Sequence, residues 1–92
     1  MTTLRTTPNG VMIEGELTVN VIPGLIDQGN TLIKQSVGDV TFDLSGVTHV
    51  DSASLALLID WVRYAKREKK VLRFKHLPGK VVQMMKLSNL NL

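Results

Sequence analysis

The chain has 92 residues, a net charge of +3, 43% hydrophobic and 21% charged residues, which is typical of one soluble globular domain. It has no cysteine, which excludes a disulfide framework and a thiolate metal site. The first ten residues lack the apolar segment of a signal peptide, and the longest apolar run, residues 55–59, is too short to span a bilayer. We therefore expect a cytoplasmic protein without direct membrane insertion.

The basic residues concentrate in the segment RYAKREKK, Arg63 to Lys70. Such a cluster is compatible with nucleic acid binding. The chain has only one Trp, one Tyr and two Phe, too few for a stacking platform on which bases could lie. Cations also complement the dipole at the C-terminus of a helix. We favour this structural role and expect no nucleic acid partner.

The N-terminal segment, residues 2–18, is predicted to be a β-hairpin. Its turn signal is Asn9-Gly10, since both residue types tolerate positive φ. After the turn, Val11, Ile13 and Leu17 alternate with polar or flexible residues. A period of two predicts a strand with one buried face.

A first helix is predicted to follow, with Asn20 as its cap and Pro23 in its first turn, where proline costs no helix hydrogen bond. Gly24 and Gly29 lower the helix propensity of this segment. Gly38 provides a stop signal.

A further strand is predicted over Asp39–Ser45, and Gly46 is predicted to turn the chain before Asp51. The next helix has an apolar stripe at helical spacing, made of Leu55, Leu58, Ile59, Val62 and Ala65. A short strand over residues 71–76 precedes a last helix, which begins near Pro78. The residues of this last helix that we expect to face inward are Val81, Val82, Met85 and Ser88.

The predicted order of elements is therefore β-β-α-β-α-β-α, in one domain over residues 1–92. Strands that alternate with helices predict an α/β fold with parallel neighbours and right-handed crossovers. Because a hairpin leads the chain, we expect a mixed four-stranded sheet. Because only three helices are predicted, we expect them to pack mainly on one face of the sheet.

Signals of catalysis are weak. The two histidines, His49 and His76, stand alone, and the chain has neither a Gly-x-Ser-x-Gly elbow nor a glycine-rich phosphate loop. Lone histidines and scattered acids do not predict a metal site. We expect a protein that is not an enzyme and that needs no cofactor.

One acidic pair leaves a catalytic alternative open. Asp43 and Asp51 could converge at a strand end, as in phosphoryl-accepting receiver domains. Such a pocket also needs a second early acid and a late lysine, and Glu16 and Lys75 match these positions poorly. We therefore expect Asp43 and His49 to cap turns instead.

The dipeptide Asp51-Ser52 stands at the start of the most hydrophobic helix. Either side chain can act as its N-cap. A hydroxyl in the first turn is also a suitable phosphate acceptor, because the helix dipole and the free N–H groups stabilise an anion there. The two interpretations are compatible, and the sequence leaves both open.

A second stripe of the same helix consists of Ala53, Leu57, Trp61 and Tyr64. Trp and Tyr are enriched at binding hot spots, so this stripe is a candidate docking surface beside Ser52. Alternatively the helix lies between two neighbours and is buried all round. The sequence does not separate these interpretations.

Together the segments VTFDLSGVTHVDSASLALLIDW, GELT (Gly15 to Thr18) and LSNL (Leu87 to Leu90) resemble the signature of STAS domains. The resemblance covers nearly the whole chain and implies a STAS fold. It also implies that Ser52, the hydroxyl residue after Asp51, is a regulated phosphoacceptor.

Within this family the chain departs from the anti-sigma-factor antagonists at Thr18, where they have Asp, and at Ser54, where they have Gly. It is more similar to the cytoplasmic STAS subunit of Mla-type phospholipid ABC transporters. That resemblance implies a non-catalytic protein that binds the transporter's ATPase subunit at the inner face of the inner membrane. The residues implied in this contact are Asp51, Ser52, Ala53, Ser54, Leu57, Trp61 and Tyr64. The alternative is an anti-sigma-factor antagonist that a partner kinase controls by phosphorylating Ser52.

Overall fold

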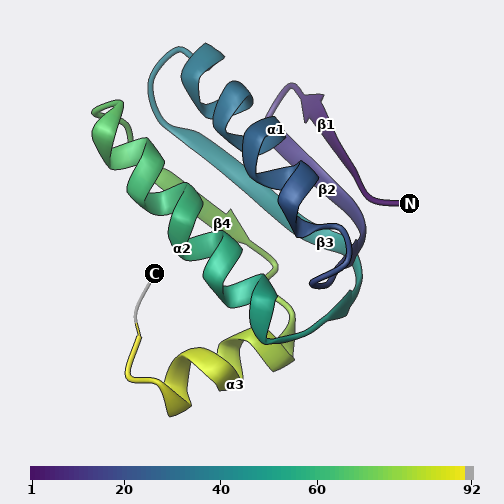
Figure 1. Cartoon of the computed structure of the whole chain (residues 1–92). Coiled ribbons are helices and arrows are strands. Elements are labelled where there is room, and N and C mark those ends of the chain that lie inside the picture. Colours follow the sequence, from purple (N-terminus) through teal and green to yellow (C-terminus); the bar gives the residue numbers. More distant parts are fainter. Residues whose placement is uncertain (91–92) are drawn as a thin grey trace.

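A four-stranded sheet in the order β1-β2-β3-β4 forms one layer of the computed structural model, which describes residues 1–90 (Figure 1). The strands are β1 (Thr3–Thr7), β2 (Gly10–Leu17), β3 (Val40–Val50) and β4 (Leu72–Lys75). β1 pairs with β2 antiparallel, whereas β2 with β3 and β3 with β4 pair parallel. The predicted mixed sheet is confirmed.

Three helices complete the fold: α1 (Ile22–Gln35), α2 (Ser52–Arg67) and α3 (Gly79–Leu87). Figure 1 shows α1 and α2 side by side on one face of the sheet, and α3 packs against α2. The predicted order of elements and the one-sided packing are therefore confirmed. None of the helices within residues 1–90 combines the length and apolarity needed to cross a bilayer.

The turn of the hairpin lies one residue earlier than predicted. Pro8 and Asn9 form it, and Asn9 keeps a negative φ. Gly10 is already the first residue of β2, with a φ of +140°, and a side chain there would clash with the backbone oxygen of Thr41. This glycine therefore allows β3 to approach, and it does not make the turn.

The predicted turn at Gly46 is wrong, because β3 runs through this residue to Val50. The pairing of β2 with β3 shifts register between Met12 and Glu14. A Cβ at Gly46 would lie 2.9 Å from the backbone oxygen of Ile13. Glycine thus keeps the two strands close at the irregularity, and the long strand carries the chain directly to Asp51.

The ends of α1 also differ from the prediction. Its N-cap is Val21, which makes no side-chain cap, so the predicted cap at Asn20 is wrong. Pro23 does lie in the first turn. The helix ends at Gln35, before Gly38, whose φ is +87°.

Lys70 of the basic cluster stabilises the C-terminus of α1. Its Nζ donates to the backbone oxygens of Ile33 (2.7 Å), Lys34 (2.8 Å) and Ser36 (2.8 Å). A cation is favourable there because the last carbonyls of a helix have no partners within the helix. The basic cluster thus has a structural role, which it performs for a neighbouring helix and not only for its own.

The core lies between the sheet and the helices, and its largest buried side chain is Trp61. The indole Nε1 donates to the backbone oxygen of Ile26 (3.3 Å), and the ring meets Phe42 edge to face, with 5.0 Å between centroids. A side chain at Gly29 would clash with the indole. Gly29 weakens helix propensity but allows α1 and α2 to approach across Trp61.

The inward-facing residues of the last helix are mostly as predicted. Val81 is fully buried, and Val82 and Met85 are half-buried. Ser88 is exposed, so its predicted inward position is wrong. It follows α3 as the C-cap residue, where the helix has ended.

Two glycines of α1 provide a test of this packing. Gly29→Ala is expected to destabilise the protein by about 1–3 kcal/mol, because overpacking at the indole outweighs the gain in helix propensity. Gly24→Ala is the matched control, since nothing lies within 4 Å of the added methyl group. It is expected to stabilise by up to about 1 kcal/mol. Urea unfolding measures both changes, and equal stabilisation of the two variants would contradict the packing described.

Candidate protein-docking site at the start of α2

Asp51 joins the start of α2 to the loop after β2. It is the N-cap of the helix and has an extended backbone, with φ −139°. Its Oδ1 accepts from the backbone N–H of Ala53 (3.0 Å), and its Oδ2 accepts from that of Val19 (3.0 Å). Both carboxylate oxygens are therefore engaged, and the capping role left open for Asp51 or Ser52 belongs to Asp51.

Ser54 completes this junction from inside. Its side chain is fully buried, with 0% exposure. The hydroxyl accepts from the backbone N–H of Asp51 (3.1 Å) and donates to the backbone oxygen of Leu17. Asp51 and Ser54 thus form a reciprocal capping box. Because it is buried, Ser54 cannot contact a partner, and its predicted place in the docking surface is wrong.

Ser52 is the first residue of α2 and is exposed to solvent. The capping box holds the helix start without its hydroxyl. The first-turn N–H groups and the helix dipole still favour an anion at this position. Val19, in the loop that Asp51 anchors, is 62% exposed. The start of α2 therefore presents a free hydroxyl next to an apolar side chain.

The second stripe of α2 is mostly core and not a docking surface. Leu57 is 1% exposed and Trp61 is 0% exposed, because α1 packs over this side of the helix. Trp61 is therefore a core residue and not an exposed docking residue as predicted, whereas Leu57, although buried, also lines a hollow between α1 and α2. Ala53 is half-buried, and Tyr64 is half-buried with the Arg67 guanidinium 5.6 Å from its ring centre. The alternative of a helix buried between neighbours is correct for this stripe.

The exposed stripe of α2 begins one residue earlier, which is about 100° around the helix. It contains Ser52, Ala56, Asp60 and Arg63, all exposed. Beside it, a hollow of about 320 Å³ lies between α1 and α2, and its lining includes Ile22, Ile26 and Ile59. We call these residues and Val19 the Ser52 surface. The sequence signal for it was the small or polar character of the residues at positions 52, 56 and 60.

The second acid of the predicted pair lies elsewhere. Asp43 is on β3 between the buried residues Phe42 and Leu44, so it points to the face of the sheet away from α1 and α2. Its Oδ1 lies 3.0 Å from the Nδ1 of His76. Asp43 and Asp51 therefore do not converge, and no acidic pocket forms between them.

Hydrogen bonds depress the pKa of Asp43. The bond with His76 has the larger effect, and a bond from the backbone N–H of Ser45 (2.9 Å) adds to it. Together they lower the pKa of this carboxyl from 3.8 to about 2. The carboxylate is thus committed to a structural contact between β3 and the segment after β4.

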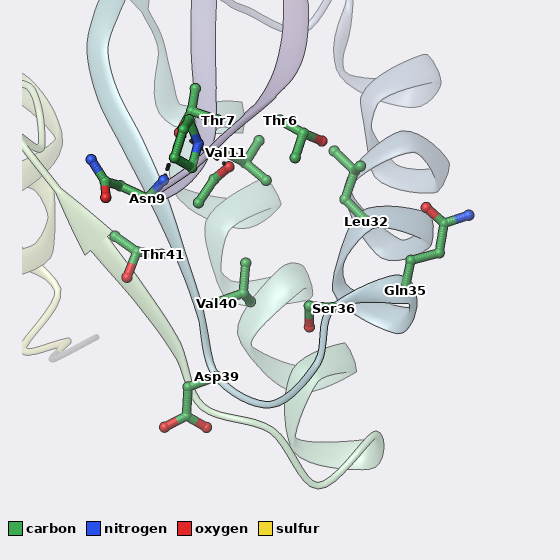
Figure 2. Close-up of a pocket in the computed structure, with 12 residues that line it drawn as sticks. Thr6, Thr7, Asn9, Val11, Leu32, Gln35, Ser36, Asp39, Val40 and Thr41 are labelled. Atoms are coloured by element: carbon green, nitrogen blue, oxygen red, sulfur yellow. Dashed lines mark hydrogen bonds between the residues drawn. The ribbon is translucent and has the colours of Figure 1, made fainter.

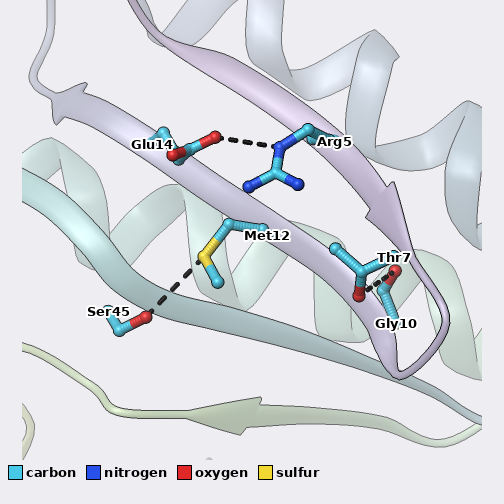
Figure 3. A network of polar contacts seen from close by, with 6 residues as sticks. All are labelled: Arg5, Thr7, Gly10, Met12, Glu14 and Ser45. Atoms are coloured by element: carbon cyan, nitrogen blue, oxygen red, sulfur yellow. Dashed lines mark hydrogen bonds and ion pairs between the residues drawn. The ribbon is translucent and has the colours of Figure 1, made fainter.

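Figure 3 shows the same open face of the sheet, with the helices behind it. Arg5 and Glu14 form an exposed ion pair (3.1 Å), and the hydroxyl of Ser45 approaches the sulfur of Met12 (3.7 Å). Within residues 1–90, no group of three or more His, Cys, Asp or Glu residues is placed to hold a metal ion.

The chain matches a family model described as "Mlab, STAS domain" over residues 2–92. This chain belongs to the MlaB-like STAS domain family. No curated protein sequence is significantly similar to it. The family match explains why the order of elements follows the STAS pattern.

Solved structures share the fold of this STAS domain. The anti-sigma factor antagonist SpoIIAA, in its unphosphorylated form, superposes with a TM-score of 0.69 at 16% identity, over 95% of this chain and 83% of SpoIIAA. A structure of Mglu superposes with a TM-score of 0.62 at 15% identity, over 85% of this chain but only 20% of Mglu. At these identities the likeness establishes the fold and not a shared function.

The two serines at the start of α2 are expected to respond differently to truncation. Ser54→Ala should destabilise the STAS domain by about 1–3 kcal/mol, because it leaves the buried oxygen of Leu17 and the N–H of Asp51 without a side-chain partner. Ser52→Ala, the matched control, should change stability by less than about 0.5 kcal/mol. Chemical denaturation checks both values. Equal losses would mean that Ser52 also holds the helix.

The pair Asp43–His76 gives an expected pH dependence. Because the folded-state pKa of Asp43 lies below the ordinary 3.8, the pair adds stability that is present above that pH and is lost as the pH falls through about 2. In a ¹³C NMR titration, His76→Ala should raise the midpoint of the Asp43 carboxyl toward 3.8. His49→Ala, the control at the other exposed histidine, should leave it unchanged. A midpoint that is unaffected by His76→Ala would contradict the assignment.

Proposed function

We propose that this STAS domain is a non-catalytic subunit that binds the ATPase of a phospholipid-transporting ABC system through the Ser52 surface. The system would maintain the lipid asymmetry of an outer membrane. The observation that carries the proposal is that Ser52 is exposed at a helix start that Asp51 and Ser54 hold without it. Membership of the MlaB-like family supports a transporter as the setting.

The chemistry of the Ser52 surface suits a protein partner. The hollow is lined by half-buried isoleucines and by Asp60 and Arg63, which are exposed. An apolar centre with a polar rim is the usual organisation of protein interfaces. Ala56 has a small side chain beside the hollow, so a partner's helix or loop can approach the backbone of α2 closely.

The polar groups of the domain favour a binding role over catalysis. Asp51 uses both oxygens to cap α2 and anchor the loop, and Asp43 is paired with His76. Neither carboxylate is free to act as a general base. On this proposal the purified domain hydrolyses no ATP by itself, and turnover belongs to the partner.

An anti-sigma-factor antagonist is the second candidate. The exposed Ser52 hydroxyl in the first turn of α2 supports it, as does the fold shared with SpoIIAA. A partner kinase would transfer the γ-phosphoryl group of ATP to Ser52 Oγ and release ADP and a proton. The phosphate would bring nearly two negative charges to the Ser52 surface. The two candidates share a surface and differ in the partner.

Ser52→Asp separates docking from folding. Asp is favourable in the first turn of a helix, so the variant should melt like the wild type. A charge buried at an apolar interface without a partner costs several kcal/mol. Binding to the ATPase subunit that co-purifies with the protein should therefore weaken about 30-fold or more, as measured by calorimetry.

Ser88→Asp is the matched control, because it makes the same change at an exposed serine after α3. It should bind with wild-type affinity. A Ser52→Asp protein that binds as tightly as the wild type would exclude the Ser52 surface as the contact. Co-purification of a kinase in place of an ABC ATPase would exclude the transporter role and favour the second candidate.

A further inference from the structure

The two edges of the sheet differ in how well they are protected from pairing with another strand. β4 has only four residues, and two of them, Arg73 and Lys75, are cationic. Short length and charge both discourage strand addition. β1 has five residues, and its one cation, Arg5, is paired with Glu14 of the neighbouring β2 (3.1 Å). It pairs with β2 in unbroken register and contains no proline or bulge, so it is the less protected edge. Within residues 1–90, no strand pairs with its outer side.

Two hollows lie beside this less protected edge, below α1. One hollow of about 350 Å³ is lined by Leu4 of β1 and by α1 residues from Asp27 to Leu32. A second, of about 490 Å³, adjoins Thr6, Leu32 and Gln35 and continues past the hairpin turn to the start of β3 at Val40. Figure 2 shows Leu32 and Gln35 on the α1 side of the second hollow and Thr6 across from them. The hollows meet at Leu32, and we call them together the edge groove.

The side chains of the edge groove suit an extended peptide. Leu4 and Leu32 are half-buried and give an apolar base. Gln28, Thr31 and Gln35 are exposed along one side of α1, at helical spacing, and offer amide and hydroxyl groups. Every second residue of an edge strand also directs its backbone N–H and C=O away from the sheet. The groove therefore has both the hydrogen-bonding edge and the side-chain contacts that strand addition uses.

The charge of the edge groove indicates which charged residue a bound extended segment would contain. Asp27 is exposed at one end of the groove, and no ion pair satisfies it within residues 1–90. We propose that the edge of β1 receives an extended segment of a protein partner as a fifth strand. Alternate side chains of this segment are apolar and cover Leu4 and Leu32, and a lysine or arginine pairs with Asp27.

A second copy of this chain fits the edge less well. Symmetric antiparallel pairing of two β1 strands places both α1 helices on the same face of the joined sheet. Each copy then brings an acidic Asp27, and neither groove supplies a basic residue to pair with it. The edge groove lies on the side of α1 away from α2, so this inference does not depend on the Ser52 surface.

A random library of seven-residue peptides displayed on phage tests the proposal. Selection on the wild-type protein is paired with counter-selection on Thr31→Trp, in which the indole fills the hollow beside β1. The enriched peptides should alternate apolar residues and carry a lysine or arginine. When such a peptide is synthesised and titrated into ¹⁵N-labelled protein, amide shifts should concentrate in Thr3–Thr7 and the facing side of α1. A version of the peptide with methylated backbone nitrogens should not bind.

Two variants with the same change of charge complete the test. Asp27→Lys should weaken the peptide about five- to tenfold, the size expected for loss of an exposed ion pair with added repulsion. Glu68→Lys, at the C-cap of α2, should bind as the wild type does. Selection that enriches no peptide, or peptides whose shifts lie outside β1 and α1, would overturn the proposal. Sedimentation that finds a dimer of the wild type but not of Thr31→Trp would also overturn it, in favour of a second copy.

Discussion

The buried hydroxyl of Ser54 connects three parts of the chain at one point. It donates to the oxygen of Leu17 at the end of β2 and accepts from the N–H of Asp51, which follows β3 and caps α2. Buried backbone groups need partners, and one left unpaired costs about 1–3 kcal/mol. Asp51 extends the same connection to Val19 before α1. The strand ends and the start of α2 are thus held together by side chains that point inward, and Ser52 is left outside.

The packing of Trp61 decides which side of α2 faces solvent. The indole lies between the sheet and α1, and Gly29 gives it room. Because a helix has a fixed angular spacing, burying Trp61 and Leu57 places Ser52, Ala56 and Asp60 on the outside. The Ser52 surface is therefore a consequence of core packing combined with a capping box that needs no help from Ser52. On our proposal, the partner contacts this one small surface, whose shape depends on both the core packing and the capping box.

Much of the fold could be predicted because it follows from local periodicity. The alternation of Val11, Ile13 and Leu17 identified a one-faced strand, and the stripe through Leu55 and Leu58 identified α2. Tertiary contacts decided what local signals could not. Gly29 lowered the helix propensity of α1 although packing requires it, and Gly46 had the signal of a turn although it only lets two strands approach.

The start of α2 was predicted in place, but the roles of the residues around it were not. Asp51 and Ser52 were correctly located at a helix start, but Trp61 belongs to a residue type that is common in both cores and interfaces. Whether Trp61 faces the core or a partner could be decided only from the structure, in which α1 covers it. The hydrogen-bonding role of Ser54 could not be predicted from the sequence either, because its partner Leu17 is distant along the chain. The edge groove has no single-residue signal, since it arises from the position of α1 over β1.

Photo-cross-linking in the native cell tests the central claim most directly. A benzophenone side chain at position 56, on the Ser52 surface, is compared with the same group at position 83, an exposed site on α3. We expect a cross-link from position 56 to an ABC ATPase subunit, identified by mass spectrometry, and none from position 83. A cross-link to that subunit from position 83 but not from position 56 would contradict this expectation.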